Sequence, residues 1–371
     1  MSGNEKLLLD ALVNPKTVLA LSATDWSLLV RLARNANLLA SVAFRLESEG
    51  LLTQIPKAPM AHLDAATRLA EKQLRGVHFE VDRIQEALAK PDMPVVVLKG
   101  AAYVIADLPT ARGRLFSDID ILVPKNKLDD VERSMMLHGW VSGQHDAYDQ
   151  HYYRTWMHEL PPLKHVTRQT VIDIHHAILP ETARLQPDSK KLLADAVPVE
   201  GKEGMFVLAP VDMVLHSATH LFHEGEFENG LRDLVDLDAL LRHLSKADGF
   251  WDVLIERAVD MDLTRPLYYA LRYSQQILQT PVPDVTMKAV IAIGKPPKPL
   301  AWLMDALFAR ALRPHHPRCD DAFTPLALWL LYIRSHYLRM PFHLLIPHLL
   351  HKAIKKRLSP AQADVPKLEN N

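Results

Sequence analysis

The chain has 371 residues, enough for two or three domains. Hydrophobic residues make up 48% and charged residues 23%, as in ordinary soluble globular proteins. Because 43 Lys and Arg stand against 44 Asp and Glu, the net charge of −1 excludes a globally basic nucleic-acid-binding protein, and any such surface would have to be local.

Three further features indicate a soluble protein that stays inside the cell. The single cysteine, Cys319, excludes an internal disulfide and a multi-cysteine metal site. The N-terminus lacks a signal-peptide pattern, because Asp10 breaks its apolar run and Glu5 lies before that run. No stretch approaches the roughly 18 apolar residues of a spanning helix. We therefore expect a soluble, cytoplasmic protein without a transmembrane segment.

The first part of the chain has the periodicity of helices. Apolar residues recur every three or four positions across 25–49, which predicts one helix that Thr24 or Asp25 caps and Gly50 ends. A second helix is expected over about 60–89. This part of the chain is therefore predicted to be a helical region.

The middle of the chain is richer in strands. Its short β-branched runs and turn residues predict strands at 94–100, 117–124 and 171–179, a hairpin over 150–168 around Pro161-Pro162, and helices at 101–108 and 125–139. Helical periodicity returns from residue 208. We expect an α+β fold in which a small mixed β-sheet is flanked by N-terminal and C-terminal helical regions.

These patterns predict four consecutive segments. They are an N-terminal helical region (1–90), an α/β core (91–207), a C-terminal helical domain (208–357) and a disordered tail (358–371).

Three aspartates are the strongest functional candidates. Asp118 and Asp120 flank Ile119 in SDIDILVP, and residues i and i+2 of a strand point to the same face. Asp173 lies in the later strand VIDIHHAIL. If the two strands are neighbours, the three carboxylates converge and repel one another unless cations neutralise them, and such oxygen-rich clusters suit Mg²⁺. Taken alone, an Asp-x-Asp pair also fits an edge strand with exposed polar residues.

Two cationic side chains precede the aspartate pair. Lys99 and Gly100 end the first strand, and Arg114 stands four residues before Asp118. Together with backbone N–H groups after Gly100, these residues could hold a triphosphate. A solvated surface position is the alternative for Lys99 and for Arg114.

The motifs taken together resemble a known superfamily. LKGAAY, SDIDILV, HELPPL, VIDIHHAILP, LAPVDMVLHSATHLFH and LRDLVDLDALL resemble a poorly characterised bacterial branch of the polymerase β-like nucleotidyltransferase superfamily, over most of residues 20–280. That superfamily has a Gly-Ser turn before its paired aspartates and a third acidic residue on a later strand. Lys99-Gly100-Ala101 replaces Gly-Ser here, so the serine hydroxyl that touches the nucleotide phosphates is missing.

The resemblance implies roles for individual residues. Asp118, Asp120 and Asp173 would be the catalytic residues and the ligands of two Mg²⁺ ions, for which Mn²⁺ is a substitute. The expected nucleotide-binding residues are Lys99, Gly100, Arg114, Ser117 and His175. The implied reaction moves a nucleoside monophosphate from an NTP, expected to be ATP, to a hydroxyl of an unknown acceptor. A small molecule or a protein is the preferred acceptor, ahead of an RNA end.

Two other classes of function stay open from the residues alone. An Asp-x-Asp motif also holds the diphosphate of a nucleotide sugar in metal-dependent glycosyltransferases, although their catalytic domains normally place a larger parallel sheet before it. A non-catalytic nucleotide-binding or scaffold protein could retain the same fold. The complete set of three aspartates argues against such a loss of activity.

Histidines in the C-terminal half add candidates. His216 and His220 have the i, i+4 spacing of metal ligands, but the pattern His-Glu-x-x-His is absent. They could pair with Asp233 or Asp236 on the next helix, or bind zinc, or line the active site, and we name His216, His220 and Asp236 as candidate wall residues. HELPPL (158–163) and Tyr103 indicate no particular chemistry.

The C-terminal segment is amphipathic and basic. Aromatic and aliphatic residues alternate there with Arg334, Arg339, Lys352, Lys355, Lys356 and Arg357. A terminal helix docked on the core is the expected structure. Peripheral contact of a basic C-terminal helix with anionic membrane or RNA is the alternative.

Overall fold

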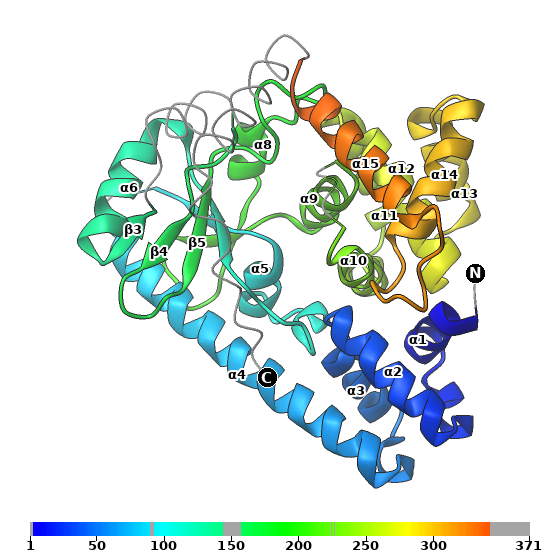
Figure 1. Cartoon of the computed structure of the whole chain (residues 1–371). Coiled ribbons are helices and arrows are strands. Elements are labelled where there is room, and N and C mark those ends of the chain that lie inside the picture. The colour runs from blue at the N-terminus through cyan, green and yellow to red at the C-terminus, as the bar shows by residue number, and fades with distance from the viewer. Residues whose placement is uncertain (1–2, 90–92, 144–156, 224, 226, 342–371) are drawn as a thin grey trace, which may run out of the picture.

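A computed structural model describes residues 3–89, 93–143, 157–223, 225 and 227–341 (Figure 1). In this part of the chain, no helix has the combination of length and apolar character that is needed to span a bilayer.

The N-terminal region is helical, as expected. Its α-helices are α1 (Gly3–Val13), α2 (Ala23–Asn35), α3 (Leu39–Ser48) and α4 (Lys57–Leu88). The single helix expected over 25–49 is wrong, because Asn37 has a φ of 56° and separates α2 from α3. The N-cap of α2 is Ser22, which forms a reciprocal capping box with Asp25.

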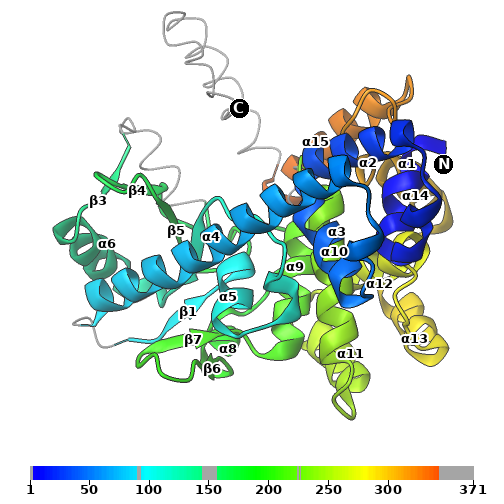
Figure 2. The same ribbon diagram turned by 90° about the horizontal axis from the view of Figure 1, so that it is seen from below.

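The longest helix joins this region to the rest of the molecule. α4 has 32 residues, packs against α3 near its start, and packs against α6 (Leu128–Leu137) near its end. Figure 2 shows it lying across one side of the sheet. Because α4 contacts both regions, it fixes the N-terminal helices relative to the strands.

A seven-stranded mixed sheet forms the centre of the protein. Its strands are β1 (Val95–Val97), β2 (Ile119–Leu122), β3 (Trp140–Ser142), β4 (Leu163–His165), β5 (Val171–His175), β6 (Val197–Pro198) and β7 (Met205–Val207). The order is β3-β4-β5-β2-β1-β7-β6, with the β2/β5 and β1/β7 pairs parallel and the others antiparallel. α5 (Lys99–Ile105) and α8 (Ser189–Ala194) complete the segment. The expected α+β fold is confirmed.

One turn differs from the expected structure. The hairpin is formed by β4 and β5 and turns through Gln169, whose φ is 62°. Pro161 and Pro162 precede β4, which is where residues without an N–H can stand without losing a ladder bond. The prediction that Pro161-Pro162 form the turn is therefore wrong, and residues 150–156 of that prediction lie outside the described residues.

The C-terminal region is again helical. It contains α9 (Pro210–His223), α10 (Gly230–Leu244), α11 (Phe250–Asp260), α12 (Thr264–Leu278), α13 (Asp284–Gly294), α14 (Lys298–Ala311) and α15 (Thr324–Arg339). α15 packs on α14 and α9, and the half-buried Arg334 donates a hydrogen bond to the carbonyl of Phe222 at 2.7 Å. Part of the docked helix is thus as expected. The basic residues 352–357 and the tail 358–371 lie outside the described residues.

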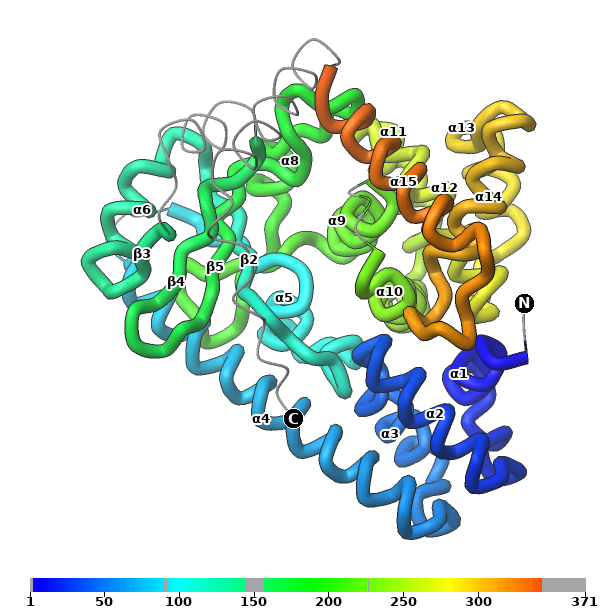
Figure 3. The backbone as a smooth tube through the Cα atoms, viewed as in Figure 1, coloured from blue at the N-terminus to red at the C-terminus, as the bar shows by residue number. Residues whose placement is uncertain are grey.

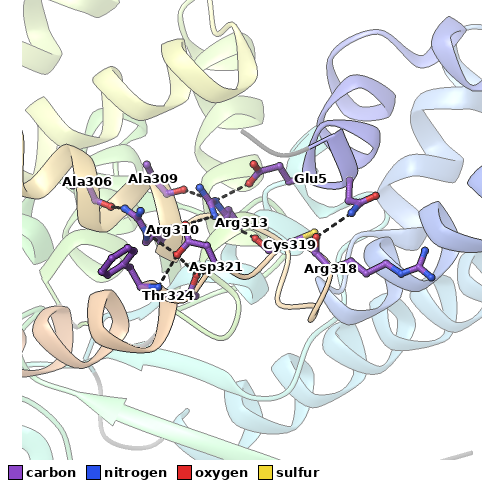
Figure 4. Close-up of polar contacts among 11 residues, drawn as sticks. Glu5, Ala306, Ala309, Arg310, Arg313, Arg318, Cys319, Asp321 and Thr324 are labelled. Atoms are coloured by element: carbon purple, nitrogen blue, oxygen red, sulfur yellow. Dashed lines mark hydrogen bonds and ion pairs between the residues drawn. The ribbon is translucent and has the colours of Figure 1, made fainter.

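An ion pair joins the first helix to the C-terminal helical region. Arg313, after α14, forms an ion pair with the fully buried Glu5 of α1 at 2.7 Å and also contacts Asp321 (Figure 4). One continuous set of buried apolar side chains runs from Leu8 to Leu331 through all three regions. α5 lies between the sheet and α9, as the tube in Figure 3 shows. The segment boundaries at residues 90 and 207 stay predictions.

Candidate active site

The two aspartate-bearing strands are neighbours. β2 and β5 run parallel, and their register places Asp120 directly beside Asp173. Residues opposite one another on paired strands point to the same face, so the two carboxylates project together. Asp118 is exposed and precedes β2, which begins at Ile119, so the expected strand start at 117 is two residues early.

Asp120 is buried and contacts the side chains of Lys99 and His175. Its Oδ1 accepts from Lys99 Nζ at 2.9 Å and lies 2.9 Å from His175 Nε2. Burial alone would raise the pKa of Asp120, but the charges and hydrogen bonds of Lys99 and His175 hold that pKa well below its usual range. Conversely, burial would lower the pKa of His175, and Asp120 and Glu159 raise it. Asp120 is therefore ionised.

Asp173 has the opposite environment from its neighbour. Burial, followed by the charges of Asp120 and Glu159, raises the pKa of Asp173 to about 7. Its Oδ1 is buried and has no hydrogen-bond partner among the residues that the structure describes. Such an oxygen is costly to bury unless a proton or a cation accompanies it. Oδ1 of Asp173 is thus a buried oxygen that the described residues leave without a hydrogen bond.

Lys99 owes its position to an unusual backbone conformation. It follows β1 with a φ of 47°, which non-glycine residues seldom adopt. The turn brings its side chain back over β2 to reach Asp120. Local strain of this kind persists where the surrounding structure holds it, often at functional sites.

Arg114 crosses the backbone of α5 at Gly100. An added Cβ on Gly100 would lie 2.0 Å from Arg114 Nη1 and 2.6 Å from its Cζ, so only glycine leaves room for this guanidinium. Arg114 Nε donates to Asp236 Oδ2 at 2.8 Å, and its Cζ lies 5.1 Å from the ring centre of Phe116. Gly100 therefore has a structural role beside its predicted contact with nucleotide.

A cavity of about 210 Å³ reaches Lys99, Arg114 and Asp120, whereas Asp173 and His175 do not line it. It is lined by Lys99, Gly100, Tyr103, Arg114, Ser117, Asp118, Asp120, Ser217, His220, Glu228, Asn229, Arg232, Asp233 and Asp236. Its lining residues come from α5, from β2 and the loop before it, from α9, and from α10 and the loop before it. Apart from His220, five carboxylates face three cationic side chains, so the wall is acidic. A triphosphate would need additional cations to enter.

The wall histidines occupy different positions. His220 lines the cavity, whereas His216 lies behind it and is buried. Burial first, then the nearby positive charges of Lys99 and His220, lower the pKa of His216 to about 3, so this ring is neutral. Among the described residues, His216 and His220 belong to no cluster of three or more metal-ligating side chains. The acids on α10 form ion pairs with arginines, Asp236 with Arg114 and Asp233 with Arg232.

Several residues near the site were not expected from the sequence. Glu159 forms an isolated bridge with His175, and its Oε2 lies 3.4 Å from His175 Nδ1. Tyr103 Oη lies 2.6 Å from Ser217 Oγ, across the cavity from α5 to α9. Neither contact follows from a local pattern, because each joins segments far apart in the chain.

Comparison with known proteins assigns the chain. Residues 22–279 match the family described as "Uncharacterised nucleotidyltransferase". The chain belongs to this nucleotidyltransferase family. No curated protein and no solved structure gave a match. The resemblance expected from the motifs is confirmed, and the protein is an enzyme of the transferase class that carries out nucleotidyl transfer. The glycosyltransferase and non-catalytic alternatives are thereby set aside.

The acidic groups suit a hard cation. Asp118, Asp120 and Asp173 offer only oxygen atoms, as Mg²⁺ prefers. The unpartnered Oδ1 of Asp173 and the acidic cavity wall are the two features of this nucleotidyltransferase that fit a divalent ion. Both contacts to Asp120 engage Oδ1, which leaves Oδ2 as the atom to test for metal binding.

Proposed function

We propose that this nucleotidyltransferase moves a nucleoside monophosphate from an NTP, with ATP as the first candidate, to a hydroxyl of a small molecule or a protein side chain. Asp118, Asp120 and Asp173 are the proposed ligands of two Mg²⁺ ions. The observation that carries this proposal is the register that pairs Asp120 with Asp173, because it sets a free carboxylate oxygen beside an ionised carboxylate.

Each protein group has a defined task in this reaction. Mg²⁺ bound at the three aspartates would polarise the α-phosphoryl group and balance the charge of the phosphates. Lys99 and Arg114, on the cavity wall, bind the β- and γ-phosphates that leave as pyrophosphate. The acceptor oxygen forms a bond to the α-phosphorus while the bond to the bridging oxygen of pyrophosphate breaks.

Asp173 is the proposed acceptor of the hydroxyl proton. A general base works best when its pKa is near the working pH, and in the metal-free protein burial together with the charges of Asp120 and Glu159 raises the pKa of Asp173 to about 7. Its neighbour Asp120 is far too acidic for this task. The paired carboxylates therefore divide into a permanently charged ligand and a group that can take a proton.

An apolar groove supports the choice of acceptor. A hollow of about 280 Å³ runs along α4 and is lined by Lys72, Gln73, Gly76, Val77, Phe79, Glu80, Phe116, Ser117, Asp118, Ile119, Thr170 and Val171. It shares Ser117 and Asp118 with the acidic cavity. The amide of Phe116 donates to Gln73 Oε1 at 2.8 Å, which ties the loop before β2 to α4.

In-line displacement needs the acceptor and the leaving group on opposite sides of the α-phosphorus. Pyrophosphate on the Lys99 side places the acceptor on the groove side of Asp118. The groove offers the aromatic ring of Phe79, half of which is exposed, and only one lysine. A hydroxyl carried by an apolar or aromatic body fits this surface better than the phosphate backbone of an RNA end.

The test of this proposal uses labelled nucleotides. The protein is incubated with Mg²⁺, each α-labelled NTP and fractions of cell extract, and pyrophosphate release is measured together with transfer of label. Mass spectrometry then identifies the labelled acceptor. Transfer that needs Mg²⁺ and is lost in Asp118→Ala supports the proposal, and Mg²⁺-independent or Asp118-independent transfer would refute it.

A further inference from the structure

A second group of metal-ligating side chains lies beside the aspartates. One ligand atom each of His158, Glu159 and His175 lies within 4.8 Å of the other two. The histidines are 6% and 4% exposed. The backbone holds the group together, because Glu159 bridges His175 and the amide of His176 donates to the carbonyl of His158 at 2.8 Å. The nucleotidyl transfer proposed above uses none of the three side chains of this histidine cluster as a ligand of Mg²⁺.

The spacing of the cluster matches a shared tetrahedral ion. Metal–nitrogen and metal–oxygen bonds of about 2.0–2.2 Å place two ligand atoms about 3.3 Å apart and two imidazole centres about 5 Å apart. His175 Nδ1 lies 3.4 Å from Glu159 Oε2. The ring centres of His158 and His175 are 5.4 Å apart with planes inclined by 32°. Only small side-chain movements would bring all three atoms onto one ion.

The outer partner of His175 completes the pattern. Its Nε2 lies 2.9 Å from Asp120 Oδ1, while Nδ1 faces Glu159. A histidine that binds metal through one nitrogen usually donates the other N–H to a carboxylate, which fixes its orientation and increases its basicity. Asp120 is therefore in the position of the carboxylate that accepts the second N–H of a metal-binding histidine.

We propose that His158, Glu159 and His175 hold one divalent transition-metal ion of the zinc class. Two nitrogens and one carboxylate oxygen favour such an ion over Mg²⁺, which prefers oxygen ligands alone. Three protein ligands leave one position for water or a substrate oxygen. This site is distinct from the Mg²⁺ position at Asp118 and Asp173, although His175 links it to Asp120. The proposal stands whether or not the Mg²⁺ assignment holds.

Metal binding by the purified full-length chain tests the site. The protein is stripped with chelator, then titrated with Zn²⁺ in excess Mg²⁺ by calorimetry, and bound metal is counted by elemental analysis. Co²⁺ serves as a spectroscopic probe through its visible absorption in a four-coordinate site. We expect one equivalent of Zn²⁺ that Mg²⁺ does not displace. His158→Ala and Glu159→Gln should each weaken binding by about 100-fold or more and remove the Co²⁺ absorption.

Matched variants separate this site from its surroundings. His216→Ala removes a similarly buried histidine that is outside the cluster, and Asp118→Asn changes the proposed Mg²⁺ position. Both should retain the Zn²⁺ equivalent. Thermal melts verify folding. If His158→Ala fails to fold, Zn²⁺ binding by the isosteric Glu159→Gln tests the site instead. The proposal is overturned if the wild type binds no Zn²⁺ in excess Mg²⁺, or if Glu159→Gln binds it as tightly as the wild type.

Discussion

Buried aspartates in two regions of this molecule differ in how many cationic and hydrogen-bond partners they have. In the C-terminal helices, Asp212 receives two hydrogen bonds of 2.8 Å from Arg257, and Asp238 is bound by Arg242 at 2.7 Å and by Thr280 at 2.7 Å. At the β2/β5 edge, several carboxylates share far fewer cations.

The sheet edge shows the contrast in its contacts. Lys99 and His175 both bind one oxygen of Asp120, while Asp173 Oδ1 has no hydrogen-bond partner among the described residues. Paired charges stabilise a scaffold, whereas a group left incompletely satisfied marks a place where something else binds. The difference separates the aspartates that we propose to act in transfer from those that pair with arginines in the helical region, without reference to sequence motifs.

The largest expected effect is on catalysis at the sheet edge. Asp118→Ala should lower transfer by about 10³-fold or more, because it removes a proposed ligand of Mg²⁺, and that ion would stabilise the transition state. Asp118 is exposed, so the melting temperature should change little. Transfer of label from α-labelled NTP and a thermal melt measure the two effects, and retained transfer would remove Asp118 from the site.

The matching change in the helical region should affect folding instead. Asp212→Ala removes the buried carboxylate that accepts two hydrogen bonds from Arg257, while Arg257 keeps Asp195 and Asp260 as partners, so the free energy of unfolding should fall by about 1–3 kcal/mol. Urea denaturation measures this loss. The transfer rate per folded molecule should stay at the wild-type value, and a selective loss of kcat in a folded Asp212→Ala variant would break the comparison.

Asp173→Asn should stabilise the metal-free protein while it abolishes transfer. The pKa of Asp173 is raised by burial and by the charges of Asp120 and Glu159 to about 7, above the value in the unfolded chain. Its carboxylate therefore destabilises the fold progressively as pH rises from about 4 to about 7, and fully above that range. The substitution should add about 1–3 kcal/mol at pH 8 and almost nothing at pH 4.

The neighbouring position supplies the opposite control. The pKa of Asp120 is depressed by Lys99 and His175 against the effect of burial, so its carboxylate stabilises the fold at neutral pH. Asp120→Asn should destabilise under the same metal-free conditions. Thermal melts of both variants across pH 4–8 give the comparison. A change in stability of the same sign in Asp120→Asn and Asp173→Asn would contradict the opposite effects that we assign to the two carboxylates.

The smallest expected effect concerns the acceptor groove. An added Cβ on Gly76 meets no atom within 4 Å, so Gly76→Leu should fold and fill the groove. We expect the acceptor concentration for half-maximal transfer to rise about tenfold, which corresponds to about 1.4 kcal/mol. Ala65→Leu adds the same side chain to an exposed position of α4 outside the groove and should have no effect.

Mg·ATP affinity separates the groove from the nucleotide cavity. It should be the same in Gly76→Leu, Ala65→Leu and the wild type when measured by calorimetry. An unchanged acceptor dependence in Gly76→Leu would exclude the groove as the acceptor site.

The sequence predicted the part of the site that depends on strand alternation and on family motifs. Asp120 and Asp173 could be placed on one face because each stands between isoleucines on a short apolar run. It could not predict that Lys99 binds Asp120 or that Arg114 binds Asp236, since both contacts depend on side-chain conformations and on the packing of distant helices.

The missed features have a common physical cause. Glu159 reaches His175 through an isolated bridge that has no repeating pattern in the sequence. The break between α2 and α3 depends on one left-handed residue, Asn37, inside an otherwise helical periodicity. Such features are set by tertiary packing or by a single backbone angle, whereas periodicity reports only averages over a turn or more.

Metal binding at the sheet edge tests the central claim most directly. Electron paramagnetic resonance counts Mn²⁺ bound at pH 8 with a non-hydrolysable ATP analogue, after one equivalent of Zn²⁺ has been added so that the histidine cluster does not contribute. We predict two Mn²⁺ ions per chain in the wild type and in Asp212→Asn, and a weakened or lost ion in Asp118→Asn and Asp173→Asn. Equal Mn²⁺ binding in all four proteins would contradict a metal site at the β2/β5 edge.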